Sequence, residues 1–320
     1  MVILDYGCGS DVGCVRELNE DSYYANTELG LWLIADGMGG YEGGNVASLI
    51  VSETVVKAVR DGRSLSEAIQ LAHGAVLSAS SEGRGPPRMG STIVALRGLN
   101  ERYEVAWVGD SRAYLWDGRL GQISRDHSYV QTLVDRGDIT KEQARTHLQS
   151  NVVTQALGAG GQQIRVDCVS GRWLIGQKIL LCSDGLNGEL SDDQISQILM
   201  SEGPDQHLVD SLIDAALQQG GRDNVSVMVI SAPANTQPKM LGRVFPRFSL
   251  RRRRHLLRIV LVTLLLVLLG LMVACAAPSR AAHHPAVDLT AASLHRQSPI
   301  AGLSSLANVA ISVAWRDSDG

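Results

Sequence analysis

The amino-acid sequence predicts an α+β fold for residues 1–232, built from antiparallel β-sheets flanked by helices. Three observations support this. Short apolar runs that end at glycine or aspartate indicate strands, and segments with apolar residues at helical spacing indicate helices. The expected elements also come in blocks, namely strands, two helices, further strands, a helical insertion and two more helices. This order is typical of antiparallel sheets with helices packed on them.

The first strands are expected at residues 12–15 and 22–25, on either side of a polar segment. An uninterrupted apolar run at 31–35 predicts a short buried strand, which stops at Asp36 and the glycines after it. A carboxylate at the end of a rigid strand, with flexible backbone behind it, suits a hard metal ion. Asp-Gly is also an ordinary turn, so this pair alone leaves both interpretations open.

Two helices are expected next. Residues 45–59 are apolar on more than one side, as in a helix that lies between two layers. Ser64 and Glu67 form a capping box that starts the second helix. The apolar residues of that helix keep helical spacing, at Leu65, Ala68, Ile69, Ala72, Val76 and Ala79.

The remaining elements follow a polar loop at residues 80–88. Helices are favoured by apolar periodicity and by two further capping boxes, Thr140 with Gln143 and Ser191 with Gln194. These helices are expected at 129–134, 140–147, 191–200 and 204–219. Strands are expected at 91–97, 101–108, 112–116, 119–123, 164–169, 177–182 and 225–231.

The charge is divided unevenly along the chain. Residues 1–232 carry 18 Lys and Arg against 30 Asp and Glu, whereas residues 233–320 carry 11 against 3. An acidic front portion suits cation binding and argues against nucleic acid as a partner. An acidic soluble domain without any metal accounts for the same charge.

The five cysteines are scattered and include no Cys-x-x-Cys pair. In a domain of this size they are typical of reduced thiols in a cytoplasmic compartment. Neither Cys8 nor Cys14 has an arginine six positions later, which excludes a phosphatase that uses a Cys-x5-Arg loop. Residues 1–10 lack a basic stretch followed by a long apolar one, so we expect no secretory signal there.

Several carboxylates share a strand-end context. Asp36 and Asp184 each follow a predicted strand and Asp223 precedes one, and the remaining acidic residues at such positions are Glu20, Asp21 and Asp110. Acidic groups gathered in this way repel one another unless cations neutralise them. Because no histidines or thiols match this set, it selects Mg²⁺ or Mn²⁺ over zinc. From the residues alone, a carboxylate metal site and a set of ordinary turns stay equally open.

Seven motifs occur in a set order that resembles the metal-dependent protein serine/threonine phosphatases (PPM, type 2C) in their compact bacterial form. The resemblance covers residues 5–231 and implies a four-layer α-β-β-α sandwich with a dinuclear metal site at one end of the paired sheets. The motifs are Arg16…Glu20-Asp21, Asp36-Gly37-Met38-Gly39-Gly40, Gly90-Ser91-Thr92, Gly109-Asp110-Ser111-Arg112, Asp126-His127-Ser128, Ser183-Asp184-Gly185 and Gly221-Arg222-Asp223-Asn224.

The resemblance also implies a role for each matched residue. Asp36 bridges two Mn²⁺ or Mg²⁺ ions, and Gly37 offers its carbonyl to one of them. Asp184 and Asp223 complete the shell of the other ion, and Asp110 with Asp184 matches a weaker third position. Glu20 and Asp21 act through metal-bound waters, Arg16 holds the phosphate, and Asn224 supports the site. The implied reaction is attack on phosphorus by a water that the two ions activate.

The sequence departs from the family pattern close to these ligands. Met38 stands where some members carry a histidine that is a candidate general acid, so leaving-group protonation is expected to fall to metal-bound water. Tyr41 and Asn45 replace the histidine and glutamate common in that loop, which affects contacts to the substrate. His127 is expected to be structural. The segment 129–158 resembles the flap over the site.

The C-terminal part differs in composition. Residues 233–258 form a basic linker, and 259–279 are an uncharged run that spans ~31 Å as a helix, close to the thickness of a bilayer core. Four consecutive arginines, 251–254, place the preceding domain in the cytoplasm by the positive-inside rule. The tail, 280–320, is expected to be a short disordered segment outside the cytoplasm.

These observations predict a single-pass membrane protein whose cytoplasmic domain hydrolyses phosphoserine and phosphothreonine. The expected partners are phosphorylated proteins, including a serine/threonine kinase that the enzyme opposes, and membrane lipid, but not nucleic acid. Two alternatives stay open. One is a catalytically silent phosphoprotein-binding module, which loss of Asp36, Asp184 or Asp223 would have indicated. The other is hydrolysis of small phosphate esters.

Overall fold

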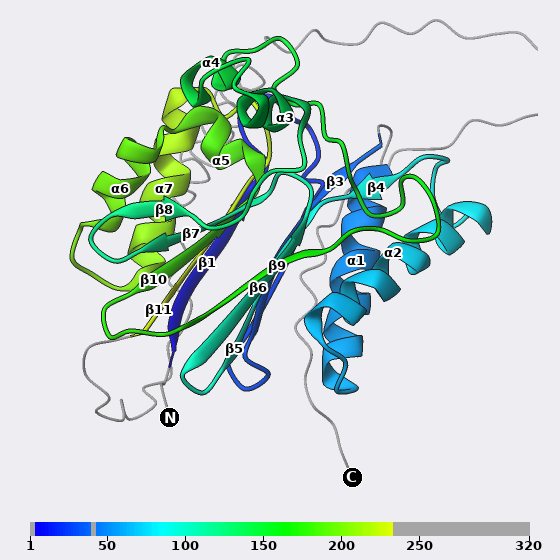
Figure 1. Ribbon diagram of the computed structural model, residues 1–320, viewed down its shortest axis with the longest axis horizontal. Coiled ribbons are helices and arrows are strands. Elements are labelled where there is room, and N and C mark those ends of the chain that lie inside the picture. Colours follow the sequence, from blue (N-terminus) through cyan, green and yellow to red (C-terminus); the bar gives the residue numbers. More distant parts are fainter. Residues whose placement is uncertain (1–3, 40–42, 233–320) are drawn as a thin grey trace, which may run out of the picture. The chain divides into compact units, whose positions relative to one another are not determined.

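The computed structural model describes residues 4–39 and 43–232 as two antiparallel sheets that face each other, each covered by helices on its outer face (Figure 1). The predicted α+β class and the antiparallel pairing are confirmed. The first sheet has the strand order β1 (Asp5–Asp11), β11 (Val225–Ser231), β10 (Lys178–Cys182), β7 (Arg112–Trp116) and β8 (Leu120–Gln122). The second has the order β2 (Asp21–Asn26), β3 (Leu31–Met38), β5 (Ile93–Leu99), β6 (Arg102–Val108) and β9 (Asp167–Arg172), with β4 (Gly90–Ser91) paired to β3.

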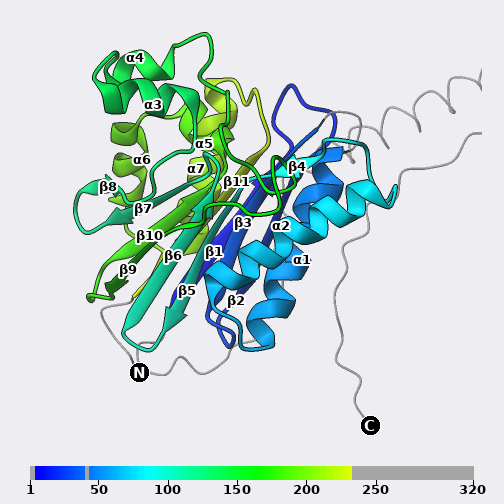
Figure 2. The same ribbon diagram turned by 45° about the vertical axis from the view of Figure 1, so that its right-hand side comes forward.

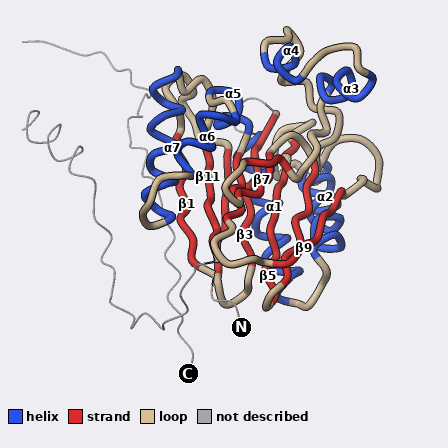
Figure 3. Tube along the Cα trace, turned by 60° about the vertical axis from the view of Figure 1, so that its left-hand side comes forward, coloured by secondary structure: helices blue, strands red, loops and turns tan. Residues whose placement is uncertain are grey.

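Two groups of helices cover the sheets, as Figure 2 and Figure 3 show from other sides. The second sheet carries α1 (Gly43–Arg60) and α2 (Leu65–Ser81), and the first carries α5 (Asp184–Glu189), α6 (Asp192–Leu199) and α7 (Asp205–Gln219). Two short helices, α3 (Tyr129–Arg136) and α4 (Lys141–Arg145), lie at one end of the sheets. The capping boxes predicted for α2, α4 and α6 are present, each with both of its reciprocal hydrogen bonds.

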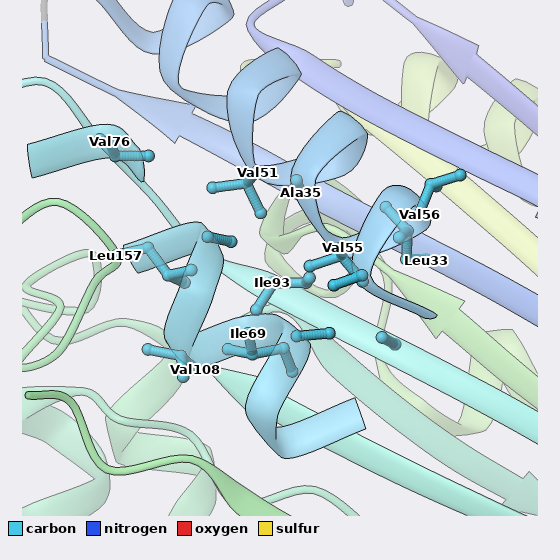
Figure 4. Close-up of a cluster of buried hydrophobic side chains, with 14 of the residues drawn as sticks. Leu33, Ala35, Val51, Val55, Val56, Ile69, Val76, Ile93, Val108 and Leu157 are labelled. Atoms are coloured by element: carbon cyan, nitrogen blue, oxygen red, sulfur yellow. The ribbon is translucent and has the colours of Figure 1, made fainter. Parts of the chain in front are cut away.

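Strand β3 is buried on both faces, which explains its unbroken apolar sequence. Successive side chains of a strand point to opposite faces. Leu31 and Leu33 therefore pack with α1 and α2, in the cluster drawn in Figure 4, while Trp32 and Ile34 pack between the two sheets. All four side chains are fully buried. Packing on both faces therefore fixes β3 up to Asp36, whose carboxylate lies near the end of the strand.

The predicted first strand is wrong. Residues 12–15 form a turn, and the strand that pairs with β11 is β1, at Asp5–Asp11. Its sequence carries little apolar signal because two of its positions are glycines that let α7 approach. A Cβ on Gly7 would lie 2.4 Å from the backbone nitrogen of Gln206 in α7. Gln206 also donates to the carbonyl of Cys8 and accepts from its N–H, which joins helix and strand.

Three strand boundaries and one helix also differ from the prediction. Strand β3 continues through Asp36 to Met38 instead of ending at residue 35, because its last residues pair with β4. The expected strand 91–97 is divided into β4 and β5 at Thr92. Strand β9 begins at Asp167, three residues later than expected. Helix α5 was not predicted, since it has only six residues and two of them are glycine.

The expected membrane-spanning helix, 259–279, lies outside the described residues, as do the linker 233–258 and the tail 280–320. Within the described part of the chain, none of the helices combines the length and the apolar character needed to cross a bilayer.

Candidate metal centre

The strand register brings the predicted acidic residues to one end of the two sheets. Asp21 opens β2 and is the cross-strand partner of Asp36 in β3. Asp184 is the first residue of α5, directly after β10, and Asp223 lies two residues before β11. Asp110 lies in the connection between β6 and β7. The side chains of Asp36 and Asp184 are hydrogen-bonded to each other. Residues from both sheets therefore meet at this end.

Burial and mutual repulsion disfavour charge on these carboxyls. Desolvation is the largest cause, and it raises the pKa of Asp21 to about 7 and the pKa of Asp184 to about 6. The pKa values of Asp36 and Asp110 are raised well above their usual range, first by burial and then by neighbouring carboxylates. A group of carboxyls whose ionisation is disfavoured by burial and by mutual repulsion is an arrangement that divalent cations would stabilise.

One oxygen of the cluster lacks a hydrogen-bond partner. Asp21 accepts hydrogen bonds at Oδ2 from the hydroxyls of Ser183, at 2.9 Å, and Ser226, at 2.6 Å. Its other oxygen, Oδ1, is buried and receives no hydrogen bond from the part of the chain that the structure describes. Buried polar atoms are normally satisfied, so this oxygen indicates a missing ligand such as a cation or its water. The two serines were not predicted as site residues. Only the fold brings Ser226 to a residue 205 positions earlier.

Arg16 lies among the carboxylates and forms an ion pair with one of them. Its Nη2 is 2.7 Å from Oδ2 of Asp223, and its side chain is 52% exposed. The hydrogen bond to Asp223 is the main cause that raises the pKa of Arg16, and the charges of Glu20 and Asp184 contribute. The arginine thus lies beside the acidic cluster, and in this structure its partner is the carboxylate of Asp223.

Asn224 ties the N-terminal segment to the site. Its Nδ2 donates to the carbonyls of Val12, at 2.9 Å, and Leu18, at 3.0 Å. Its Oδ1 accepts from the backbone N–H of Glu20 at 2.8 Å. Because the three bonds span both ends of the turn that carries Arg16, this buried amide sets the position of Arg16, Glu20 and the start of β2. The expected supporting role of Asn224 stays a prediction, to which these contacts give a structural basis.

The glycine after Asp36 leaves no room for a side chain. A Cβ on Gly37 would lie 2.1 Å from the carbonyl oxygen of Gly44 and 2.6 Å from that of Glu20. The Glu20 side chain accepts the N–H of Gly44 at 3.1 Å, and its carbonyl accepts the hydroxyl of Ser48 at 2.6 Å. The close packing of β3, the start of α1 and Glu20 therefore requires glycine at position 37.

His127 is buried and engaged on both ring nitrogens. Its Nδ1 accepts from the N–H of Gly109, and its Nε2 lies 3.2 Å from Asp167. Its neighbour Asp126 forms hydrogen bonds to the guanidinium of Arg112 through both carboxylate oxygens. These contacts hold the turn that presents Asp110, which agrees with the structural role expected for His127. Of the other departures from the family pattern, Tyr41 lies outside the described residues.

A cavity of about 550 Å³ borders the carboxylates. Asp110, Asp184 and Asp223 line it, as do residues of α3 and α4. The segment predicted as a flap thus bounds a space that reaches the acidic cluster. It is tied to the rest of the fold by isolated β-bridges at Ser128 with Val153 and Ser91 with Leu157.

Comparison with known proteins assigns the family. Residues 14–214 match the family described as Protein phosphatase 2C. This chain belongs to the protein phosphatase 2C family. It is 35% identical over 254 residues to the serine/threonine protein phosphatase PstP of Mycobacterium tuberculosis. The aligned region covers 76% of this chain and 48% of PstP. It is 31% identical over 235 residues to the serine/threonine phosphatase stp of Listeria monocytogenes, covering 69% of this chain and 93% of the relative.

Solved structures of the phosphatase 2C family share this fold. The catalytic domain of PstP, crystallised in complex with two manganese ions, superimposes with a TM-score of 0.66 at 34% identity, covering 73% of this chain and all of that one. The two helix-covered sheets and this structural match confirm the four-layer arrangement that the sequence motifs imply. The chain spans about half the length of full PstP.

The residues of this phosphatase 2C member fit a divalent cation. The donors are carboxylates, and the pKa values of Asp21, Asp36, Asp110 and Asp184 are raised. The buried Oδ1 of Asp21 receives no hydrogen bond from the described residues. An all-oxygen donor set suits Mn²⁺ and Mg²⁺. Within residues 4–39 and 43–232, no three His, Cys, Asp or Glu side chains are arranged closely enough to hold a metal as they stand. The repulsion that raises the pKa values opposes a tighter cluster.

Proposed function

We propose that this chain is a Mn²⁺- or Mg²⁺-dependent protein serine/threonine phosphatase. The observation that carries the proposal is the buried group of Asp21, Asp36, Asp110 and Asp184, whose raised pKa values call for cations, at the edge of a cavity large enough for a substrate. Membership of the phosphatase 2C family supports the same activity. The relatives in Mycobacterium tuberculosis and Listeria monocytogenes are serine/threonine phosphatases by name.

The proposed ligands are the residues that the motifs predict. Asp36 and the carbonyl of Gly37 would hold cations on the β3 side, and Asp184 and Asp223 would hold them from the other sheet. Glu20 and Asp21 would act through bound waters, and Asp110 with Asp184 would form a weaker third position. When bound, the ions supply a water that ionises near neutral pH and a field that stabilises negative charge on the phosphoryl oxygens.

The protein groups contribute binding and orientation. Arg16 uses one nitrogen on Asp223, which leaves further donors of its planar fork for the oxygens of a phosphate. Asn224 keeps Arg16 and Glu20 in position through its three backbone contacts. No protein nucleophile is needed. The buried thiol of Cys182 has its pKa raised to about 12 by desolvation, so it is not a thiolate at neutral pH.

The activity can be tested with the full chain and a phosphothreonine peptide. We expect turnover that depends on added Mn²⁺, is abolished by excess EDTA and is insensitive to okadaic-acid-type inhibitors. Release of inorganic phosphate is the measurement. Full activity in excess EDTA would refute the metal assignment.

We further propose that residues 259–279 anchor the enzyme in the cell membrane, with the phosphatase domain in the cytoplasm. The support is the sequence: an uncharged apolar run that follows four consecutive arginines. A serine/threonine kinase that phosphorylates the same proteins is the proposed counterpart of the enzyme.

A further inference from the structure

The walls of the cavity beside the carboxylates carry charges of opposite sign. Helix α4, on the flap side, contributes Lys141 and Arg145. Helix α6, on the other side, contributes Asp192 and Asp193. All four residues are exposed. A substrate bound between the two helices therefore meets cations on one wall and anions on the other.

The two cations on the flap wall are available to a ligand. Lys141 and Arg145 are four residues apart on α4, so they lie on the same face of the helix. Neither takes part in any ion pair formed among the described residues. Glu142 also lines the cavity, and its pKa is lowered first by hydrogen bonds at the start of the helix and then by the charge of Lys141, although the two side chains form no ion pair.

The other arginines of the cavity are already engaged. Arg112 is bound by Asp126, and Arg222 donates from Nε and Nη2 to the two oxygens of Glu189. These pairs have internal partners and need no ligand. Lys141 and Arg145 are thus the cations of this cavity that form no ion pair within the described structure.

The acidic wall has a structural explanation that Lys141 lacks. Asp192 and Asp193 are the first two residues of α6, where negative charge stabilises the positive end of the helix dipole. Lys141 is the first residue of α4, where a positive charge opposes that dipole. A cation that does not stabilise its own helix and forms no ion pair is available to a negatively charged ligand.

We propose that Lys141 and Arg145 select phosphorylated segments that carry an acidic residue beside the phosphorylated serine or threonine. This inference rests on the proposed phosphatase function. With the phosphate at the carboxylate cluster, the flanking residues extend into the adjoining cavity. Successive side chains of an extended peptide point to opposite sides, so one flank faces α4 while its neighbour faces the acidic wall. The acidic wall disfavours a second acidic side chain there.

The test uses the full chain with Mn²⁺ and phosphothreonine peptides of equal length that carry acidic, neutral or basic flanks. We expect kcat/KM to be about tenfold higher for the acidic peptide than for the neutral one, the scale of two partly exposed charge pairs. The double variant Lys141→Glu/Arg145→Glu should reverse the order and favour the basic peptide. The ratio of two kcat/KM values in one preparation does not depend on the fraction of folded enzyme.

The matched control is Arg102→Glu/Arg172→Glu, which makes the same change in net charge. These two residues are exposed cross-strand partners, at the start of β6 and the end of β9, and neither lines the cavity. Its peptide preference should equal that of the unaltered chain. The inference would be overturned if Lys141→Glu/Arg145→Glu shifted the peptide preference no more than the control does. It would also be overturned if the unaltered chain showed no preference among the peptides. No turnover on any peptide would instead contradict the proposed function, and the inference with it.

Discussion

At the scale of single residues, the site combines carboxylates that resist ionisation with one arginine that already has an acidic partner. Asp36 is hydrogen-bonded to Asp184 and senses the charges of Asp21 and Asp223. Arg16 contacts Asp223 alone among them. The two residues therefore have separable proposed roles, Asp36 in holding cations and Arg16 in holding phosphate.

Substitution of each residue separates these roles. Asp36→Asn removes a charge proposed to hold both cations, so Mn²⁺ affinity and turnover should fall together, with turnover reduced by at least ~10²-fold. Arg16→Lys keeps the positive charge but loses the planar guanidinium that can bind two phosphate oxygens, so Mn²⁺ affinity should stay nearly unchanged. The fall in kcat/KM should correspond to a loss of about 1–3 kcal/mol of transition-state stabilisation. Calorimetric Mn²⁺ titration beside steady-state kinetics measures both. Equal loss of metal in the two variants would make Arg16 a structural partner of the carboxylates instead.

The raised pKa values predict how the chelated protein responds to pH. The pKa of Asp21 rises from 3.8 to about 7 on folding, so its protonated form stabilises the folded state. This contribution to stability is complete below pH 3.8 and is lost as pH rises to 7. Asp184 acts in the same direction up to pH 6 or so. With EDTA, Tm should therefore fall between about pH 5 and pH 7.5, and saturating Mn²⁺ should remove most of this fall.

Differential scanning calorimetry across this pH range checks the expectation. Asp21→Asn, which cannot ionise, should show a smaller fall in Tm than the unaltered chain under the same chelating conditions. A Tm that rises with pH in EDTA would show that the cluster is not held in its protonated form.

At the scale of secondary-structure elements, close approach rather than apolar content decides where the edge strand forms. Strand β1 completes the first sheet although its sequence has few apolar residues, because Gly7 and Gly9 let α7 pack directly on its backbone. Periodicity could not reveal this, since glycine carries no side chain. The same reason explains why α5, a six-residue helix that contains two glycines, escaped prediction.

A pair of glycine substitutions tests this account. Gly7→Ala places a Cβ 2.4 Å from the backbone nitrogen of Gln206, so the free energy of unfolding should fall by about 1–3 kcal/mol. Gly74→Ala, in the exposed middle of α2 with no atom within 4 Å of the new Cβ, should raise it by up to ~1 kcal/mol. Urea unfolding of both variants gives the two values. Equal effects would contradict close helix–strand contact at Gly7.

At the scale of the whole molecule, the described domain and the C-terminal sequence have different chemistry. The domain holds the acidic site, and residues 233–320 carry the basic linker and the apolar run. If the run crosses the bilayer, the arginines before it keep the domain on the cytoplasmic side. The enzyme would then act on phosphoproteins near the inner membrane surface.

Topology reporters test this arrangement in cells. A reporter fused after Gly320 should be active only outside the cytoplasm, and one fused near Pro238 should behave as cytoplasmic. Deletion of residues 259–277 should release the protein from the membrane fraction. The opposite reporter pattern would refute the orientation, and retention after the deletion would refute the anchor.

The sequence by itself determined that the candidate metal ligands are carboxylates, and it determined their order along the chain. It also determined the strands that are apolar on both faces and the helices that start with capping boxes. Each of these signals is local, because it depends on a side chain and its near neighbours. The motif order in turn indicated the family and the two layers of sheet.

Only the tertiary structure decided which of these residues meet. It placed Asp21 against Ser226, Arg16 against Asp223 and the cations of α4 across a cavity from α6. Strand periodicity encodes which face is buried but not which distant strand lies beside it. The pairing of β1 with β11 and the packing of the two sheets supply that information, because they alone bring together residues about 200 positions apart.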